Sequence, residues 1–205
     1  MTTPFNPHIY HITHIANLTG ILAAGGLWSD AQRIARKLDV TNIGHRHIKN
    51  RRLSRPVPVA ARGHLGDYVP FNFCNRSVML YPIHIGHADY SDGQDPIVHL
   101  VSDVRAATAL QRPWTFTDRH AELPYAEFYD DLGQLDEIAW PVMDKTYWSD
   151  DKEERQAEFL VHDFFPWSAV LSIGVHTPAR SVELAAILGQ AAHRPPVLVQ
   201  PTWYY

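Results

Sequence analysis

The sequence predicts a single α+β domain in which strands and helices alternate irregularly along the chain. Segments that alternate apolar and polar side chains are interspersed with segments whose apolar residues recur at helical spacing. No linker rich in Gly, Ser or Pro divides the 205 residues, which are enough for one substantial core. Hydrophobic residues make up 45% of the chain and charged residues 20%, so the composition is that of a folded globular protein.

Strands are predicted where strict alternation or short apolar runs are bounded by turn residues. Residues 9–12 alternate in this way ahead of the first predicted helix. The later predicted strands follow in chain order over 68–73, 96–101, 114–117, 156–161, 170–175 and 197–200.

Helices are predicted from helical spacing together with capping and charge signals. Residues 17–24 have apolar side chains at this spacing and stop at Gly25 and Gly26. Residues 30–38 begin with an acid and end with bases, as the helix dipole favours. The remaining predicted helices are the basic 47–53, ended by Pro56 and Pro58, then 103–110 with an Asp cap, and the amphipathic 181–192.

The stretch from Asp118 to Glu154 has no regular period and is predicted to be a functional loop. It is acidic and rich in aromatic residues, namely Tyr125, Phe128, Tyr129, Trp140, Tyr147 and Trp148. Aromatic side chains on such a loop are suited to stacking on unpaired bases.

Charge is distributed unevenly, although the net charge is only −4. Residues 33–62 carry nine of the eighteen Lys and Arg residues against one acid, whereas residues 118–163 carry fourteen acids against four bases. The basic segment is suited to phosphate groups, and a solvated helix face is the alternative interpretation. The acids would repel a long phosphate backbone, which favours a short single-stranded site.

Simple features of the sequence exclude several classes of protein. The longest apolar runs are far shorter than the roughly 18 residues that span a bilayer, so no membrane contact is expected. The start, Met1-Thr2-Thr3-Pro4, lacks the charged and apolar regions of a signal peptide. Cys74 is the only cysteine, which excludes an internal disulfide and favours a reducing, cytoplasmic location.

Glu158 interrupts an apolar β-type run that extends from 156 to 161. With a period of two, Glu158 shares one face of the strand with Gln156 and Leu160. The other face is formed by Ala157, Phe159 and Val161. Because a buried carboxylate is costly unless it is paired, Glu158 is interpreted either as a surface residue of an edge strand or as a site residue.

Thirteen histidines raise the question of a metal site. His8, His11 and His14, or His84 and His87, have spacings that could converge on zinc. They have no Cys partners and no HExxH helix, so no metal site is predicted. The sequence also contains neither GxGxxG nor a P-loop.

Six motifs occur in one order that is more specific than any of them alone. They are Tyr10-His11-Ile12-Thr13-His14, His47-Ile48-Lys49-Asn50-Arg51-Arg52, Asp67-Tyr68-Val69-Pro70-Phe71-Asn72-Phe73, Phe116-Thr117-Asp118-Arg119-His120, Gln156-Ala157-Glu158-Phe159-Leu160-Val161 and Trp203-Tyr204-Tyr205. From about residue 8 to the C-terminus, the chain resembles the DarT family, bacterial toxins that ADP-ribosylate thymidine bases in single-stranded DNA.

The resemblance implies a mono-ADP-ribosyltransferase fold with a split central sheet and flanking helices. It also implies NAD⁺ as co-substrate and a macrodomain antitoxin that removes the modification. Within a single domain over 1–205, the basic segment 33–62 would bind NAD⁺, and a loop over about 119–158 would read the single-stranded DNA.

Carried over position by position, the resemblance makes Glu158 the catalytic glutamate and Arg52 the essential arginine. The adjacent Arg51 is the alternative for the arginine. The residues implied to bind NAD⁺ are His11, Ile12, Thr13, Gly20, Leu27 and Arg51. The residues implied to contact DNA are Gln156, Arg119, Tyr147 and Trp148.

The expected chemistry needs one fixed carboxylate. Cleavage of the nicotinamide–ribose bond passes through an oxocarbenium-like state, which Glu158 would stabilise while it binds the ribose 2′-hydroxyl. Nicotinamide is already cationic in NAD⁺, so no general acid is needed to expel it. Arg52 stays charged and would stabilise the thymine imide anion and the NAD⁺ diphosphate, which leaves the N3 proton to water, a carboxylate or a histidine.

Two alternatives are retained. The acceptor could be guanine, as in a related branch of these toxins. A non-catalytic single-strand-binding module would also fit the basic segment and the aromatic loop, but it would not explain the pair of His11 and Glu158.

Overall fold

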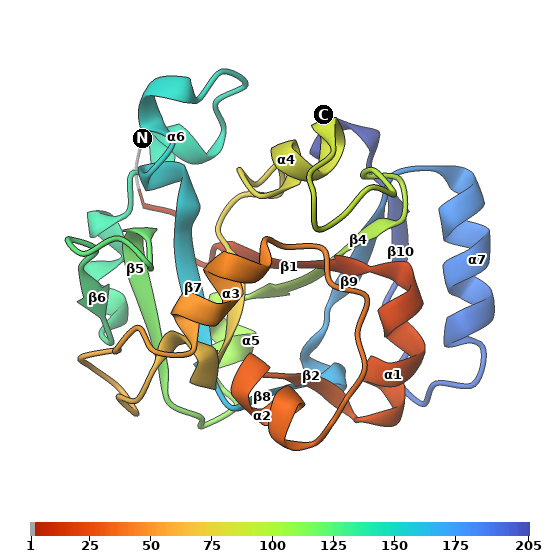
Figure 1. Cartoon of the computed structure of the whole chain (residues 1–205), viewed down its shortest axis with the longest axis horizontal. Helices are drawn as coiled ribbons and strands as arrows, with labels where there is room; N and C mark the ends of the chain where they lie inside the picture. Colours follow the sequence, from red (N-terminus) through yellow and green to blue (C-terminus); the bar gives the residue numbers. More distant parts are fainter. Residues whose placement is uncertain (1–2) are drawn as a thin grey trace.

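A central eight-stranded sheet organises the computed structural model, which describes residues 3–205 (Figure 1). The strand order is β10-β9-β4-β1-β3-β7-β5-β6, and the paired neighbours are antiparallel except for β9 and β10. The bounds are β1 (His8–His14), β3 (Tyr68–Asn72), β4 (Ile97–Asp103), β5 (Trp114–His120), β6 (Phe128–Tyr129), β7 (Ala157–His162), β9 (Ser172–Val175) and β10 (Val197–Val199). A separate two-stranded sheet pairs β2 (Gly26–Trp28) with β8 (Phe164–Pro166).

The sheet is split between β1 and β3. These strands are matched at one residue pair, Tyr10 with Asn72, whereas β1 is matched to β4 along its whole length. Beyond that pair the two strands diverge, and the His11 ring enters the gap with its Nδ1 2.8 Å from the Pro70 carbonyl oxygen. The predicted α+β class with a split central sheet is therefore confirmed.

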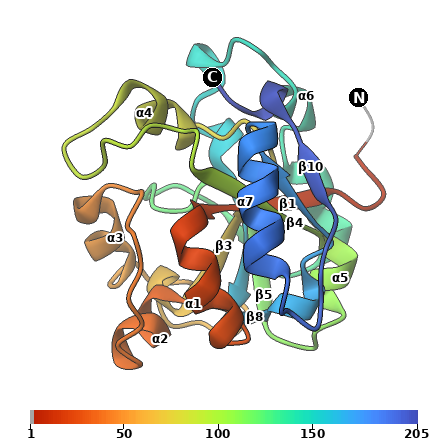
Figure 2. The same cartoon turned by 90° about the vertical axis from the view of Figure 1, so that its right-hand side faces the viewer.

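Short helices cover both faces of the sheet. Figure 2 shows α1, α2 and α3 on one side of the strands and α5 on the other, while α7 packs on β9 and β10. Their bounds are α1 (Leu18–Ala23), α2 (Asp30–Ala35), α3 (Arg46–Arg52), α4 (Leu80–Ile85), α5 (Val104–Thr108), α6 (Trp140–Met143) and α7 (Pro178–Leu188). The predicted Asp cap is present, because an Asp103 carboxylate oxygen accepts a 2.7 Å hydrogen bond from the Ala106 N–H at the start of α5.

Strand alternation decides which side chains enter the core. On β7, Ala157, Phe159 and Val161 are fully buried in the main hydrophobic cluster. Leu160 points the other way, into a smaller cluster with Tyr68. Glu158 shares the face of Leu160, as the period of two predicts, and lies 6% exposed outside the main cluster.

Some predicted boundaries are wrong. The segment over 118–154 is not a plain loop, because β5 continues to His120, where it pairs with Ala157, and β6, α6 and several 3-10 turns follow. Gln156 ends such a turn and does not belong to β7.

Two predicted helices are shifted. The helix over 30–38 ends at Ala35, because Lys37 takes a left-handed φ of 55° and closes the end of α2. The helix over 181–192 is α7, which starts earlier because Thr177 caps it and Pro178 occupies the first turn. The short elements β2, β8 and α4 were not predicted from the sequence.

Among residues 3–205, no helix combines the length and apolar character that a membrane crossing requires. Met1 and Thr2, which belong to the start examined for a signal peptide, lie outside the described residues.

Candidate active site

Arg52 and Glu158 form a bidentate ion pair beside the split in the sheet. Arg52 Nη1 donates to Glu158 Oε1 at 2.9 Å, and Nη2 donates to Oε2 at 2.8 Å. The two side chains are 12% and 8% exposed. They come from the last residue of α3 and the second residue of β7, which lie 106 positions apart in the sequence. Breaking a buried pair of this kind typically costs about 3–5 kcal/mol.

An irregularity in β5 provides further hydrogen bonds to Glu158. The pairing of β5 with β7 shifts between Phe116 and His120, so backbone groups there leave the ladder. The Ala121 N–H donates to Glu158 Oε1 at 3.3 Å, and the Glu158 N–H donates to Thr117 Oγ1 at 3.1 Å. Both the carboxylate and the backbone of Glu158 are therefore held in place.

The charge state of Glu158 follows from two opposing effects. Burial would raise the pKa of Glu158, but the charge and hydrogen bonds of Arg52 hold that pKa below its ordinary value. Burial likewise disfavours the charged form of Arg52, while the Glu158 carboxylate raises the Arg52 pKa. At neutral pH the site therefore contains a carboxylate anion and a guanidinium cation.

His120 is a site residue that sequence reasoning did not single out. Burial lowers the pKa of His120, and Glu158 and Arg52 are close enough to act on it with opposite signs. The imidazole is therefore neutral near pH 7 and can accept a proton. It also lines a cavity of about 390 Å³ together with Arg51, Ser54, Arg55, Pro56, Glu122 and Leu123. His120 ends the Phe116–His120 motif noted in the sequence, but nothing in that motif indicated a role for it.

Arg51 and Arg52 point to different places. The exposed Arg51 forms a bidentate pair with Glu122, in which Nη2 lies 2.9 Å from Oε2. Arg52, and not Arg51, reaches Glu158 in this structure. The geometry therefore favours Arg52 for the essential arginine.

A second charged group lies close to Arg52. Lys49 Nζ is 3.5 Å from an Asp30 carboxylate oxygen, and Arg33 Nε is 3.2 Å from the same oxygen. Burial would raise the pKa of Asp30, but Lys49 and Arg33 lower it. Burial lowers the pKa of Lys49. These charges also act on His11 and Arg52, so the group forms part of the electrostatic surroundings of the site.

The residues predicted from β1 divide between the site and the core. Burial lowers the pKa of His11, whose Nδ1 faces the Pro70 carbonyl. Ile12 is buried in a second hydrophobic cluster and contributes no exposed side chain. Thr13 Oγ1 accepts a 3.0 Å hydrogen bond from Asn17, which also bonds the backbone of Thr41. Asn17, not recognised from the sequence, thus ties β1 to the segment that leads into α3.

Gly20 and Leu27, both predicted to bind NAD⁺, lie at the surface and in the core, respectively. Gly20 is exposed on α1, with no atom within 4 Å of the position of a Cβ. Leu27 is 6% exposed in the main core, because β2 pairs with β8 and turns this apolar side chain inward. The contact of Leu27 with NAD⁺ stays a prediction, and in the structure its side chain packs in the core.

Two of the residues predicted to contact DNA are engaged with protein groups. Arg119 Nε donates to Asp118 at 2.7 Å, and its guanidinium lies 3.8 Å from both Glu153 and Glu154. Gln156 donates from Nε2 to the Lys152 carbonyl at 2.9 Å. A strand of DNA would have to replace some of these contacts.

The other two predicted DNA contacts lie at an aromatic surface. Tyr147 is 90% exposed, and the Trp148 ring meets Tyr81 edge-on at 6.0 Å and Tyr205 at 6.3 Å. The guanidinium of Arg76 lies 4.1 Å from the Tyr205 ring centroid. We call Tyr81, Trp148 and Tyr205 the aromatic platform.

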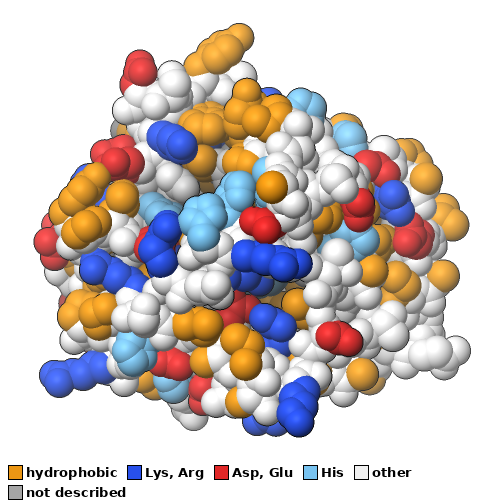
Figure 3. Space-filling view, viewed as in Figure 1, with side chains coloured by type: hydrophobic (Ala, Val, Ile, Leu, Met, Phe, Trp, Pro, Cys, Tyr) orange, Lys and Arg blue, Asp and Glu red, His pale blue; other side chains and the backbone are white. Residues whose placement is uncertain are grey.

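The basic segment 33–62 is less free than its composition indicates. Figure 3 shows Lys, Arg and His side chains across the middle of the face that includes α3. Five of the nine basic residues in this segment form ion pairs with carboxylates, namely Arg33, Arg46, Lys49, Arg51 and Arg52. Whether this segment is a phosphate site or a solvated helix face, its positive charge is smaller than the composition indicates, because these carboxylates neutralise part of it.

Comparisons with known proteins point to one family. The profile of the family described as "ssDNA thymidine ADP-ribosyltransferase, DarT" matches residues 10–205. A DNA ADP-ribosyl transferase of Thermus aquaticus is 45% identical over 199 residues, covering 96% of this chain and 88% of the relative. The solved structure of Thermus sp. 2.9 DarT in complex with ADP-ribosylated ssDNA has a TM-score of 0.95 at 41% identity, covering 100% and 99% of the two chains. The complex of that protein with NAD⁺ has a TM-score of 0.89 at 40% identity, covering 100% of both chains.

The split sheet and its likeness to these structures define an ADP-ribosyltransferase fold. The chain belongs to the DarT family of DNA ADP-ribosyltransferases. The resemblance noted from the sequence motifs is thereby confirmed, as are the predicted fold and the class of enzyme, a DNA mono-ADP-ribosyltransferase.

Proposed function

We propose that this enzyme transfers ADP-ribose from NAD⁺ to thymidine bases in single-stranded DNA and releases nicotinamide. The observation that carries the proposal is the buried Glu158 carboxylate, kept ionised by Arg52 next to the split in the sheet. Similar structures with NAD⁺ and with ADP-ribosylated ssDNA support the choice of donor and acceptor.

For the donor, Glu158 binds the ribose 2′-hydroxyl and stabilises the positive charge that develops on the ribose. Glu158 Oε1 accepts from Arg52 and Ala121, whereas Oε2 accepts from Arg52 and has a second lone pair that can accept from the ribose 2′-hydroxyl. The ion pair stays in place, and the remaining N–H groups of the guanidinium face the diphosphate or the acceptor base. Fixed charges already in place need little reorganisation during the reaction.

For the acceptor, the thymine N3 proton needs a base other than the guanidinium, whose pKa Glu158 raises further. We assign this role to His120, which is neutral near pH 7 and close enough to Glu158 and Arg52 to feel their charges. Arg52 stabilises the imide anion while the proton moves to the imidazole.

We assign the remaining site residues from the family resemblance, within one functional domain over 1–205. His11, Thr13, Gly20 and Arg51 line the NAD⁺ site built from the basic segment 33–62 and β1. Ile12 and Leu27 shape that site from the core.

The single strand lies along the segment 119–158. Its bases stack on Tyr147 and on the aromatic platform, while Arg119 and Gln156 contact the strand. Base–aromatic stacking is worth about 1–3 kcal/mol per base, which is enough to order a short unpaired segment.

In its biological setting, we assign the enzyme to the cytoplasm as the toxin of a toxin–antitoxin pair. The family membership supports this assignment, and the partner is a macrodomain protein that removes the modification. Expression in bacteria should stop growth, and co-expression of an active macrodomain hydrolase of this specificity should restore it. Unimpaired growth with detectable modified DNA would contradict the toxin assignment.

The identity of the acceptor base is tested with four single-stranded oligonucleotides. Each carries a single base, thymine, guanine, adenine or cytosine, and all its other positions are abasic. Incubation with NAD⁺ should add one ADP-ribosyl group to the thymine oligonucleotide alone, as seen by mass spectrometry. N3-methylthymine should block the transfer, because the attacking nitrogen is occupied. Modification of the guanine oligonucleotide instead would establish the alternative acceptor, and no product on any of them would contradict the transfer.

A further inference from the structure

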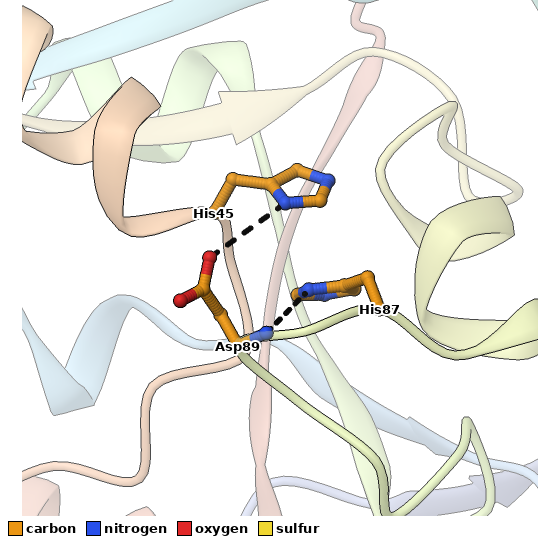
Figure 4. Close-up of side chains that lie close together, drawn as sticks. All are labelled: His45, His87 and Asp89. Carbon is orange, nitrogen blue, oxygen red and sulfur yellow. Dashed lines mark hydrogen bonds and ion pairs between the residues drawn. The ribbon is translucent and has the colours of Figure 1, made fainter.

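Two histidines and an aspartate from separate parts of the chain meet at the beginning of α3 (Figure 4). His45 directly precedes this helix, and His87 and Asp89 lie in the turn that follows α4. One ligand atom from each residue lies within 4.8 Å of the other two. The group takes no part in the transfer steps proposed above.

The hydrogen bonds around the group favour a lone pair on His87. Its Nε2 lies 3.3 Å from the Ile43 carbonyl oxygen, so this nitrogen donates and Nδ1 carries the lone pair. Metal-binding histidines in proteins commonly donate their other ring N–H to a carbonyl or carboxylate in this way. The Nδ1 lone pair accepts a 3.3 Å hydrogen bond from the Asp89 N–H, which a bound ion would replace. His45 Nδ1 lies 3.8 Å from the Asp89 carboxylate.

We propose that His45, His87 and Asp89 bind a divalent transition-metal ion, for which Zn²⁺ is the best fit. Zn²⁺ takes imidazole and carboxylate ligands in tetrahedral sites, and water can occupy the fourth position. Two imidazoles argue against Ca²⁺ and Mg²⁺, which prefer oxygen ligands. A tetrahedral site with bonds of about 2.0–2.1 Å separates its donor atoms by roughly 3.3 Å, so the three side chains must close slightly. The partly exposed side chains of His45 and Asp89, at 32% and 25%, have room to do so.

The ion has a structural role. It joins the beginning of α3 to the turn after α4, which already touch through His87 and the Ile43 carbonyl. Arg46 adds a contact between them, since its N–H lies 3.1 Å and its guanidinium 3.7 Å from the Asp89 carboxylate. The Arg46 side chain is 79% exposed, so that contact is weakly held. Because α3 also carries Lys49 and Arg52, a bound ion fixes the helix that supplies the site arginine without entering the reaction.

The test uses the full chain without an affinity tag, freed of metal with EDTA and titrated with Zn²⁺ against a chelating dye at pH 7.5. We expect one equivalent of Zn²⁺ per chain, and at least about tenfold weaker binding in His87→Gln and in Asp89→Asn. His84→Gln is the matched control, since His84 lies against the rings of Tyr81 and Tyr205 and should leave binding unchanged. Co²⁺ in place of Zn²⁺ should give the intense visible absorption of a four-coordinate site.

Equal Zn²⁺ binding by the wild-type chain and both variants would overturn the proposal, as would an absence of stoichiometric binding. The pale spectrum of six-coordinate Co²⁺ on the wild-type chain would also overturn it. That spectrum needs no variant, so it decides the matter even if His87→Gln fails to fold. Thermal unfolding in EDTA, which should be unaltered in the variants, separates loss of the ligand from loss of the fold.

Discussion

At the scale of single residues, the surroundings of Glu158 determine its chemistry. A carboxylate at this depth would ordinarily become protonated, but two hydrogen bonds from Arg52 and one from Ala121 favour the ionised form. The same contacts fix the direction of the carboxylate before any substrate binds. Such an anion stabilises an oxocarbenium-like state more than it stabilises neutral bound sugar.

Replacing Glu158 with Gln keeps the shape of the side chain and removes its charge. Transfer should fall on the order of 10²–10³-fold, because stabilisation of the developing positive charge is lost while NAD⁺ binding is largely kept. The modification rate and the NAD⁺ affinity are measured side by side, with thermal unfolding as the check on folding. Turnover within tenfold of the wild-type rate would remove Glu158 from the mechanism.

Replacing Arg52 with Lys keeps the positive charge and removes the planar guanidinium group that donates to both Glu158 oxygens. Activity should fall by the equivalent of about 1–3 kcal/mol, since an ammonium group cannot donate to both carboxylate oxygens and a second anion in the same geometry. Arg51→Lys is the comparison, because Arg51 is assigned to the NAD⁺ site but is exposed and pairs with Glu122, so its loss of activity should be smaller. A nearly normal Arg52→Lys enzyme alongside an inactive Arg51→Lys enzyme would exchange the roles of the two arginines.

At the scale of elements, α3, β5 and β7 assemble the site from three parts of the chain. Helix α3 ends at Arg52, the irregular end of β5 supplies Thr117 and Ala121, and β7 supplies Glu158. The aromatic platform is assembled in the same way, from α4, the segment after α6 and the C-terminus.

Trp148→Ala tests the aromatic platform. The variant should bind a single strand about 5- to 150-fold more weakly, the equivalent of about 1–3 kcal/mol for one stacked base, with NAD⁺ affinity unchanged. Phe5→Ala is the control, since Phe5 is an exposed aromatic residue that packs on Arg105 of α5. Fluorescence anisotropy of a labelled oligonucleotide measures the DNA affinity of each variant. Equal weakening in the two variants, or none in either, would remove Trp148 from the DNA site.

Prediction from the sequence succeeded where local pattern determines structure. Alternation around Glu158 predicted its face, because a strand with one buried face must follow the period of two. Arg52 and Glu158 were each predicted as site residues through the family resemblance, but their pairing, which spans 106 residues, was not predicted. Leu27 lies in the core because β2 pairs with β8, and its partner Phe165 comes 138 positions later, which no local pattern announces. The placement of His120 beside Glu158 depends on the irregular end of β5, so it was likewise not predictable from the neighbouring residues.

At the scale of the whole molecule, buried neutral histidines make the stability of the fold depend on pH. His99 is fully buried between the Asn75 carbonyl and the Tyr204 hydroxyl, and burial lowers its pKa to about 4. The unfolded chain therefore takes up a proton on His99 between pH 6.5 and about 4, whereas the folded chain does not.

The contribution of His99 is thus complete above pH 6.5 and is lost as the pH falls towards 4, by up to about 3 kcal/mol. Urea unfolding of the wild-type chain should show this decline between pH 7 and pH 4.5, with His11 and His120 adding to it in the same direction. His99→Gln should be less stable at pH 7 but should depend less on pH. An unchanged pH dependence in this variant would contradict the assignment to His99.

Transfer to an unpaired thymine can be tested by a competition between two forms of one oligonucleotide. Thymine N3 is hydrogen-bonded to adenine in a duplex, and exposing it costs a few kcal/mol that a chain of net charge −4 has little positive surface to recover. Equal amounts of the labelled single strand and of the same strand annealed to its complement are incubated with enzyme and NAD⁺, and the ADP-ribosylated product of each is quantified. We expect modification of the single strand with little or none of the duplex, whereas comparable modification of both would show that the enzyme opens DNA itself.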